Sequence, residues 1–156
     1  MARARRHWLF KSEADVFSID DLAAAPARTT HWDGIRNYQA RNLLRDEIRK
    51  GDLVLFYHSS SEPTGVAGVA RVVRDAYPDP TQFDPASDHH DPQSPGDDPR
   101  WLCVDVRFVR KLPRVIPLSE LKSNPALAAM MVTRRGARLS IQPVTDAEYD
   151  AVLAMV

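Results

Sequence analysis

The feature that most constrains the fold is a strand with apolar side chains on both faces. Residues 52–58 have the sequence DLVLFYH, and successive side chains of an extended chain point to opposite sides of a sheet. A strand of this kind has to be covered from above and from below. We therefore predict a central strand in a sheet that is flanked by helices.

The following segment predicts a second long strand, over residues 65–75. Its sequence, GVAGVARVVRD, contains Gly65 and Gly68, which permit the bend or bulge that a barrel needs where strands turn corners. Further strands are predicted at 7–10, 101–112 and 138–143. Helices are predicted at 18–25, 37–50, 118–122, 124–131 and after Thr145. This order does not fit a doubly wound fold and predicts one α+β domain over residues 1–156, with a small mixed barrel or strongly bent sheet.

Local signals predict where several helices begin and end. Ser18 is expected to be the N-cap of the first helix. Thr145 and Glu148 have the spacing of a capping box for the last helix. Gly51 follows the periodic segment 37–50 and is expected at its C′ position.

Charge is distributed unevenly although the formal net charge is zero. Residues 75–99 contain seven Asp and no Lys or Arg, which leaves 21 Lys and Arg against 14 Asp and Glu in the rest of the chain. We expect a long, partly ordered loop at about 76–99, because the stretch is rich in Asp and Pro. The basic remainder is either ordinary solvated surface or a face that attracts phosphate groups.

The sequence lacks the well-marked catalytic and cofactor motifs. It contains no P-loop, GxGxxG, HExxH, CxxC or GxSxG, so no cofactor is expected. The run DHHD at 88–91 has metal-binding residue types, but four adjacent loop residues rarely converge on one ion, and no metal is expected. His58 and Ser59 are neighbours on a strand and point to opposite faces, which argues against a nucleophile–base pair. Glu13 and Asp33 could form a carboxylate pair.

The single cysteine, Cys103, is predicted to be a small buried residue of a strand and not a nucleophile. One cysteine fits a reducing compartment. The basic start MARARRHWLF is not followed by the apolar region of a signal peptide, and no apolar run is long enough to span a bilayer. We therefore expect a cytoplasmic protein without a membrane partner, and we favour a monomer.

Residues 31–42, HWDGIRNYQARN, combine aromatic rings with side-chain amides. Aromatic rings stack on bases, and the amides of Asn and Gln match the hydrogen-bonding edges of bases. Trp32, Asn37, Tyr38 and Gln39 are therefore the residue types that a pocket for a base would use. The alternative is that Trp32 and Tyr38 anchor the core while Asn37 caps a helix.

Several motifs resemble those of the EVE domain, a family of the PUA-like superfamily. The resemblance rests on WLFKSEADVFSIDDL, WDGIRNYQARNLLR, GDLVLFYHSS, GVARVVRDAYPDPTQFDP, PRWLCVDVRFVRKL and RRGARLSIQPV. It implies a mixed β-pseudo-barrel of five to six strands flanked by helices, with a cleft beside the barrel. It also implies a non-catalytic domain that binds DNA or RNA and holds a modified base, such as a methylated cytosine or adenine.

The matching motifs imply which residues form the site. The base-binding pocket is expected to be lined by Lys11, Ser12, Glu13, Trp32, Asn37, Tyr38, Gln39, His58, Ser59 and Trp101. Phosphate contacts are expected from Arg36, Arg41, Arg134 and Arg135. In this assignment Trp32 or Tyr38 stacks on the base and Glu13 accepts a hydrogen bond from an exocyclic amine. Replacing Trp32 with alanine should then abolish binding without unfolding the protein.

The chain departs from the family pattern in three places. Ala14 replaces the usual proline after KSE, His89 and His90 lie where tyrosines are usual, and YHSS replaces YHSN. Two other functions stay open. One is a PUA-like enzyme, such as a nuclease, that uses the same cleft, and the other is a protein that binds a small metabolite.

Overall fold

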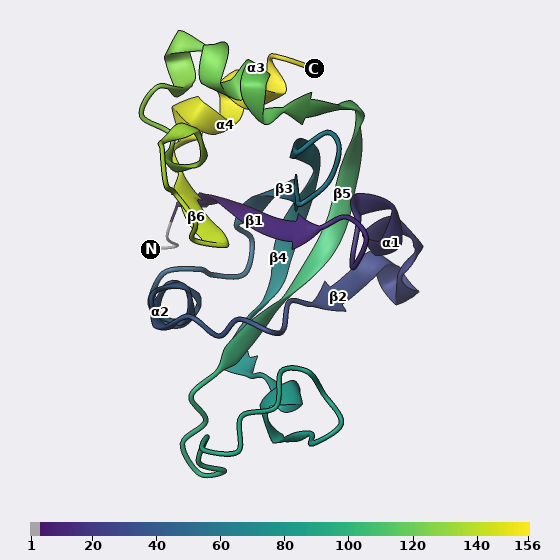
Figure 1. The fold of residues 1–156 in the computed structure, drawn as a ribbon, viewed down its shortest axis with the longest axis vertical. Coiled ribbons are helices and arrows are strands. Elements are labelled where there is room, and N and C mark those ends of the chain that lie inside the picture. The colour runs from purple at the N-terminus through teal and green to yellow at the C-terminus, as the bar shows by residue number, and fades with distance from the viewer. Residues whose placement is uncertain (1–3) are drawn as a thin grey trace.

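The structure is a computed structural model that describes residues 4–156. A six-stranded mixed sheet forms its centre. The strands lie in the order β2–β5–β4–β3–β1–β6 (Figure 1). Their bounds are β1 His7–Glu13, β2 Thr29–His31, β3 Leu53–Ser59, β4 Gly65–Pro78, β5 Leu102–Pro117 and β6 Ile141–Val144. β1 and β3 are parallel, and the other neighbouring strands are antiparallel. The predicted α+β architecture, a mixed sheet of five to six strands flanked by helices, is confirmed, with a sheet that is bent but not closed.

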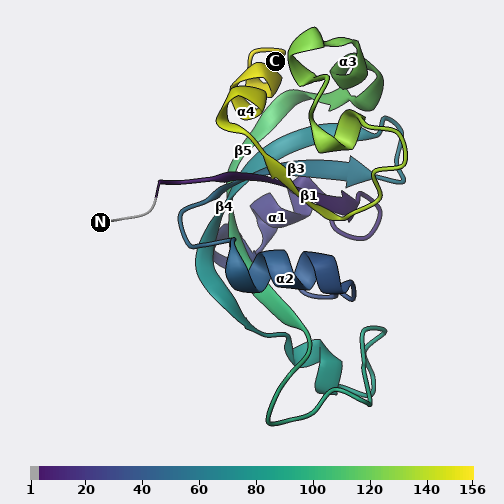
Figure 2. The ribbon, with the colours of Figure 1, turned by 90° about the vertical axis from the view of Figure 1, so that its left-hand side faces the viewer.

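Four α-helices cover the two faces of this sheet (Figure 2). They are α1 Ile19–Ala24, α2 Tyr38–Asp46, α3 Leu118–Ser123 and α4 Asp146–Leu153. Short 3-10 turns lie at Pro26–Arg28, Pro80–Phe83, Pro125–Leu127 and Met131–Thr133. None of the helices within residues 4–156 combines the length and apolar character needed to cross a membrane.

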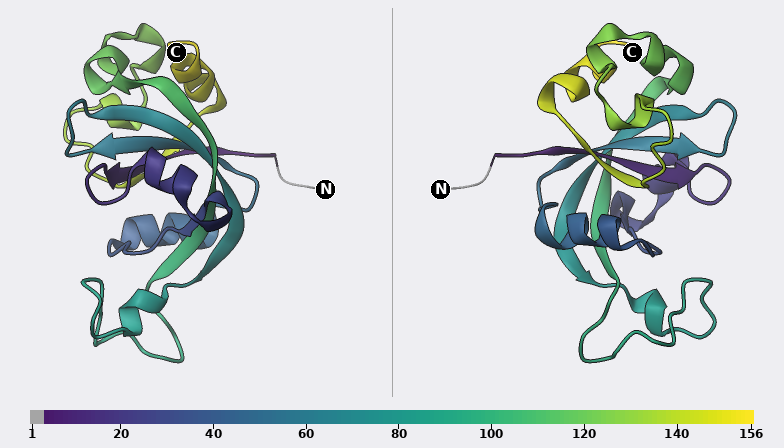
Figure 3. Two further views of the ribbon diagram at one scale, coloured as in Figure 1. Left: turned by 90° about the vertical axis from the view of Figure 1, so that its right-hand side faces the viewer. Right: turned by 60° about the vertical axis from the view of Figure 1, so that its left-hand side comes forward.

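The core is divided by the sheet into two clusters, as the pattern of β3 predicts. Phe56 of β3 packs in a cluster with residues of α1 and α2. Leu55, which points the other way, packs in a second cluster with residues of α3 and α4. Figure 3 shows the two pairs of helices separated along the sheet. The prediction of a central, doubly covered strand is confirmed.

Gly68 allows the sheet to bend around α1. The pairing of β4 with both neighbouring strands shifts register close to this residue. A Cβ atom on Gly68 would lie 2.6 Å from the side chain of Ile19 and 2.7 Å from the backbone oxygen of Arg110. The predicted bulge is confirmed. A glycine is needed there because β4 lies too close to α1 and to β5 for a side chain to fit.

The helix ends show where local signals suffice and where they do not. Both capping motifs are present, with Ser18 capping α1 and Thr145 capping α4. Helix α2 ends at Asp46 rather than Lys50, because the Leu43 oxygen accepts from the nitrogens of both Glu47 and Ile48. The predicted C′ role of Gly51 is wrong: this glycine, at φ 99°, belongs to the turn before β3.

Several strands were missed or predicted too short. β1 continues to Glu13 and β4 to Pro78, each three residues past its predicted end. β2, of three residues, was not predicted, because its sequence TTH has no apolar alternation. β5 continues five residues past the predicted end at 112, to Pro117, and carries the chain up to α3.

Cys103 is fully buried in β5, as predicted. Burial is the largest effect on its thiol and raises its pKa to about 12. Since the thiolate is the reactive form, we expect no reaction of the folded protein with a thiol reagent such as Ellman's reagent at pH 8. One thiol should react after denaturation in urea. Rapid labelling of the folded protein would contradict this prediction.

Candidate functional site

A cavity of about 570 Å³ opens where the end of β1 faces the segment that follows β2. It is lined by Lys11, Ser12, Glu13, Val16, Phe17, Thr30, His31, Trp32, Asp33, Gly34, Ile35, His89 and Ser140. Volumes of 300–1,000 Å³ are typical of sites for small molecules and cofactors. Four of the ten predicted pocket residues line this cavity, namely Lys11, Ser12, Glu13 and Trp32.

The turn between β1 and α1 forms one wall of the cavity. The Ser12 hydroxyl donates to the backbone oxygen of Phe17 at 2.6 Å. The backbone nitrogens of Val16 and Phe17 both donate to the oxygen of Glu13 at 2.9 Å. These three bonds close a tight turn that holds Phe17 half-buried in the wall and leaves Val16 exposed.

Trp32 belongs both to the cavity wall and to the core. Its side chain is only 8% exposed, and its ring centroid lies 5.4 Å from those of Phe10 and Phe56. The backbone nitrogen of Trp32 donates to the oxygen of Val104 at 2.7 Å. The expectation that Trp32→Ala leaves the fold intact is therefore inconsistent with this packing.

Lys11 and Asp33 provide opposite charges in the cavity. The Lys11 ammonium group donates to the backbone oxygen of Ala137 at 3.2 Å, and burial lowers its pKa. Burial is also the largest effect on Asp33 and, together with the carboxylate of Asp79, raises its pKa. The carboxylate of Asp33 lies 3.3 Å from His31 Nε2. Both carboxylates of the predicted pair, Glu13 and Asp33, line the cavity.

Gly34 brings the loop of residues 79–101 against the cavity. Its φ is 79°, and a Cβ atom there would lie 2.7 Å from the ring of His89. The backbone nitrogen of Gly34 donates to the carboxylate of Asp79 at 2.8 Å. The imidazole of His89 can therefore pack on the backbone and complete the cavity wall.

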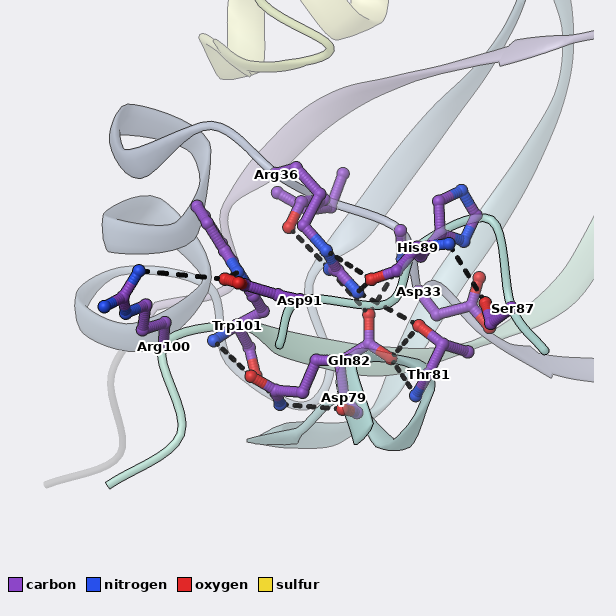
Figure 4. Close-up of polar contacts among 12 residues, drawn as sticks. Asp33, Arg36, Asp79, Thr81, Gln82, Ser87, His89, Asp91, Arg100 and Trp101 are labelled. Carbon is purple, nitrogen blue, oxygen red and sulfur yellow. Dashed lines mark hydrogen bonds and ion pairs between the residues drawn. The ribbon is translucent and has the colours of Figure 1, made fainter. Parts of the chain in front are cut away.

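Arg36 and Asp79 fasten that loop to the segment before α2 (Figure 4). Asp79 is fully buried, and its carboxylate accepts from Gly34, from both the backbone and the hydroxyl of Thr81, and from Arg36. Burial alone would raise the pKa of Asp79, but these hydrogen bonds outweigh it and lower the pKa. Asp79 is therefore held as a charged, fully hydrogen-bonded group.

The guanidinium group of Arg36 is fully engaged within the protein. It donates to the backbone oxygen of His89 twice, and to Ile35 oxygen, Asp79 and the Thr81 hydroxyl. These five bonds equal the number of N–H donors that an arginine side chain has. The predicted role of Arg36 as a phosphate contact is therefore wrong in this structure, where the residue holds the loop in place.

Gln82 organises the interior of the same loop. Its side-chain nitrogen donates to the backbone oxygens of Asp79 and Trp101, and its side-chain oxygen accepts from Ser94 and from Trp101 nitrogen. Trp101 is buried, and its indole nitrogen donates to Asp91 at 2.7 Å. The loop was predicted at about 76–99, whereas β4 continues to Pro78 and the loop lies between β4 and β5. Trp101 supports that loop rather than lining the cavity.

The start of α2 and the end of β3 do not reach the cavity either. Asn37 caps α2 by accepting from Ala40 nitrogen at 3.0 Å. Tyr38 is half-exposed and packs on Trp101, with ring centroids 4.9 Å apart, and Gln39 is exposed. His58 is buried and accepts from the backbone nitrogen of Ile19 at 3.1 Å, while its neighbour Ser59 is half-buried. These residues do not line the cavity.

The remaining predicted phosphate contacts lie on the surface. Arg41 donates to the backbone oxygen of Arg100 at 3.0 Å, and its guanidinium group lies 4.9 Å from the ring centroid of Tyr38. Arg134 and Arg135 are exposed in the segment before β6, and Ala137 of that segment contacts Lys11. Their phosphate-binding role stays a prediction.

The sequence analysis missed most of the cavity wall. Phe17, His31, Gly34 and His89 line it without having been proposed for it, and Asp33 had been considered only as one of a carboxylate pair. The available signal was the run HWDGI, in which every residue lines the cavity. Within residues 4–156, no three His, Cys, Asp or Glu side chains are grouped so that they could hold a metal ion.

Comparison with known proteins gives a consistent result. The family model of the EVE domain matches residues 6–155. Human thymocyte nuclear protein 1 is 48% identical over 167 residues, covering 96% of this chain and 73% of the relative. A crystal structure of the human protein in complex with DNA containing 5-methylcytosine is 47% identical, with a TM-score of 0.90 and 96% of each chain covered. A structure of a Pseudomonas syringae protein is 43% identical, also with a TM-score of 0.90, covering 96% of this chain and 98% of the other.

Proposed function

Because the chain belongs to the EVE domain family, we propose that its cavity binds a modified base of a nucleic acid, with 5-methylcytosine in DNA as the first candidate. The observation that carries this proposal is the human relative that was crystallised with 5-methylcytosine-containing DNA. The match to that structure covers 96% of both chains, with a TM-score of 0.90.

The composition of the cavity suits a base that has left its stack. Phe17 and the imidazoles of His31 and His89 offer flat surfaces to the base. The carboxylates of Glu13 and Asp33 offer hydrogen-bond acceptors to its edge. Enzymes and readers that take a base out of the stack use this combination of stacking and edge hydrogen bonds. A buried methyl group adds about 0.8 kcal/mol to binding.

Phosphate groups on either side of the base would be bound by Lys11 and by exposed arginines of the segment that Lys11 contacts. Lys11 lies inside the cavity, and Arg134 and Arg135 are exposed beyond Ala137, to which Lys11 donates. Arg36 is not used for this purpose, since its donors hold the loop. Contacts to phosphate make binding weaker as salt is added, whereas binding of an uncharged small metabolite would depend little on salt.

The test is a titration of short labelled oligonucleotides, followed by fluorescence anisotropy at one fixed salt concentration. Each DNA or RNA carries cytosine, 5-methylcytosine, adenine or N6-methyladenine at one position. We expect 5-methylcytosine DNA to bind at least about fourfold more tightly than cytosine DNA, which corresponds to one buried methyl group at ~0.8 kcal/mol. Lys11→Ala should weaken this binding, while Lys122→Ala on α3 should not. Equal affinity for all bases would contradict the proposal.

We also propose that the domain binds nucleic acid without catalysing a reaction on it, since the sequence contains no catalytic motif. An enzymatic function has one observation in its favour, which is that Lys11 with its lowered pKa shares the cavity with Glu13 and Asp33. Perturbed groups of this kind occur at catalytic sites. Incubation of the same oligonucleotides with the protein for hours, followed by gel analysis, separates the two functions. Cleavage that is lost in Glu13→Gln would favour the enzyme.

A further inference from the structure

We propose that Asp33 selects the base, because its carboxyl group binds the amino-bearing edge of cytosine and so separates 5-methylcytosine from thymine. This inference rests on the proposed function and names the residue that gives it specificity. Asp33 lies at the centre of the segment 31–35 that lines the cavity, next to the arginine–aspartate pair in Figure 4.

A site for 5-methylcytosine in DNA has to reject thymine by a polar contact. Thymine carries a methyl group at the same ring position, so neither stacking nor the methyl contact tells the two bases apart. They differ at position 4, where cytosine has an amine that donates and thymine has an oxygen that accepts. They also differ at N3, which accepts in cytosine and donates in thymine. Only a group that faces this edge can discriminate between them.

Asp33 is the carboxylate in the cavity that is placed for this task. Within residues 4–156, the ion-pair partner of the Asp33 carboxylate is His31, whose Nε2 lies 3.3 Å away. The His31 side chain is itself 56% exposed. The buried carboxylate of Asp79, in contrast, already accepts four hydrogen bonds. Glu13 is exposed at the end of β1. Asp33 is thus half-buried in the cavity with acceptor capacity that is not used by the protein.

The surroundings of Asp33 favour uptake of a proton. Burial and the nearby Asp79 carboxylate raise its pKa, while His31, His89 and Arg36 act in the opposite direction with less effect. Lys11 and Glu13 also line the same cavity. The net direction is upward, so Asp33 binds a proton more readily than an ordinary aspartate.

One proton shared between Asp33 and the base would produce the selectivity. A proton from solvent lies between one carboxyl oxygen and cytosine N3, while the other oxygen accepts from the N4 amine. Because N3 of cytosine is a basic nitrogen, this bond takes on the character of an ion pair, and such hydrogen bonds are roughly twice as strong as neutral ones. Thymine offers a weakly basic carbonyl oxygen and forms only neutral bonds. Binding of 5-methylcytosine therefore takes up a proton and strengthens as pH falls.

The experiment compares single-stranded oligonucleotides that carry 5-methylcytosine, cytosine or thymine at one position, by anisotropy between pH 8 and pH 6. For the unmodified protein we expect 5-methylcytosine to be preferred over thymine by at least about tenfold, or ~1.4 kcal/mol, with affinity rising as pH falls. In Asp33→Asn the amide can pair with either base, so the preference should fall below about threefold and the pH dependence should disappear. Asp15→Asn, the matched change of an exposed carboxylate that does not line the cavity, should keep both properties.

Further variants show whether a residue other than Asp33 gives the selectivity. Circular dichroism of Asp33→Asn and of Asp33→Ser checks that both remain folded. If Asp33→Asn keeps the preference over thymine, or if His31→Gln removes the pH dependence while Asp33→Asn retains it, the inference is overturned. A protein that prefers 5-methylcytosine over cytosine but does not depend on Asp33 contradicts this inference alone. A protein that binds all three oligonucleotides equally contradicts the proposed function itself.

Discussion

Replacing Asp79 with alanine is expected to lower the free energy of unfolding by about 3–5 kcal/mol, the usual effect of removing one partner from a buried ion pair. The Asp79 side chain is fully buried and accepts hydrogen bonds from Gly34, Thr81 and Arg36. Without it, the Arg36 guanidinium and the Gly34 nitrogen lose a partner in the interior. Urea denaturation at pH 7 measures the loss. The loop that carries His89 should also become sensitive to proteases.

Asp84→Ala, an exposed carboxylate of the same loop, is the control for Asp79 and should change stability by less than about 0.5 kcal/mol. A loss below about 1 kcal/mol in Asp79→Ala would show that the buried pair does not hold the loop.

Lowering the pH should protonate Asp79 and weaken the same interactions. Because the pKa of Asp79 is lowered from its ordinary value of 3.8, its stabilising effect is full above pH 3.8 and is lost as pH falls through the lower folded value. Asp79→Asn should lose less stability over that range.

Trp32→Ala is expected to destabilise the protein by about 3–5 kcal/mol, as large aromatic truncations in cores do. Trp32 packs against Phe10, Phe17 and Phe56, so its removal opens a space at the centre of the first core cluster. For a domain of this size the loss corresponds to a fall in melting temperature of roughly 6–20 °C. Thermal unfolding followed by circular dichroism measures it.

Trp32→Phe is the control, since it keeps an aromatic ring in the same place and should be destabilised less. If Trp32→Ala melts within about 2 °C of the unmodified protein, the ring is not part of the core. The double role of Trp32 also limits its use as a binding probe. Loss of nucleic-acid binding in Trp32→Ala could follow from unfolding, which is why Lys11→Ala and Asp33→Asn are the better tests of the cavity.

Much of the fold was predictable, because it follows from patterns that span few residues. The alternation of side chains in β3 predicts that Leu55 and Phe56 pack on opposite faces, and they do. Capping at Ser18 and Thr145 needs only the three residues that follow each of them. The end of α2 was less predictable. Ile48 continues the apolar stripe and is buried, but hydrogen bonding to Leu43 oxygen ends the helix earlier.

The candidate site was predictable only in part. The end of β1 was identified through the resemblance to the EVE domain, and Trp32 through its residue type together with that resemblance. Tyr38 was assigned to the pocket on residue type and Trp101 through the family resemblance, although they pack on one another away from the cavity. An aromatic ring has the same stacking capacity in a base pocket and in a structural contact, so its type does not decide between these uses.

The sequence by itself determined the central strand β3, the bulge at Gly68 of β4, the caps of two helices and the family. The tertiary structure decided which polar groups are free to act. Arg36 and Asp79 are 43 residues apart in the chain, and Arg36 and His89 are 53 apart. Whether an arginine binds phosphate or holds a loop depends on which acceptors the fold brings to it. No pattern of neighbouring residues contains that information, because the partners meet only when the distant segments pack together.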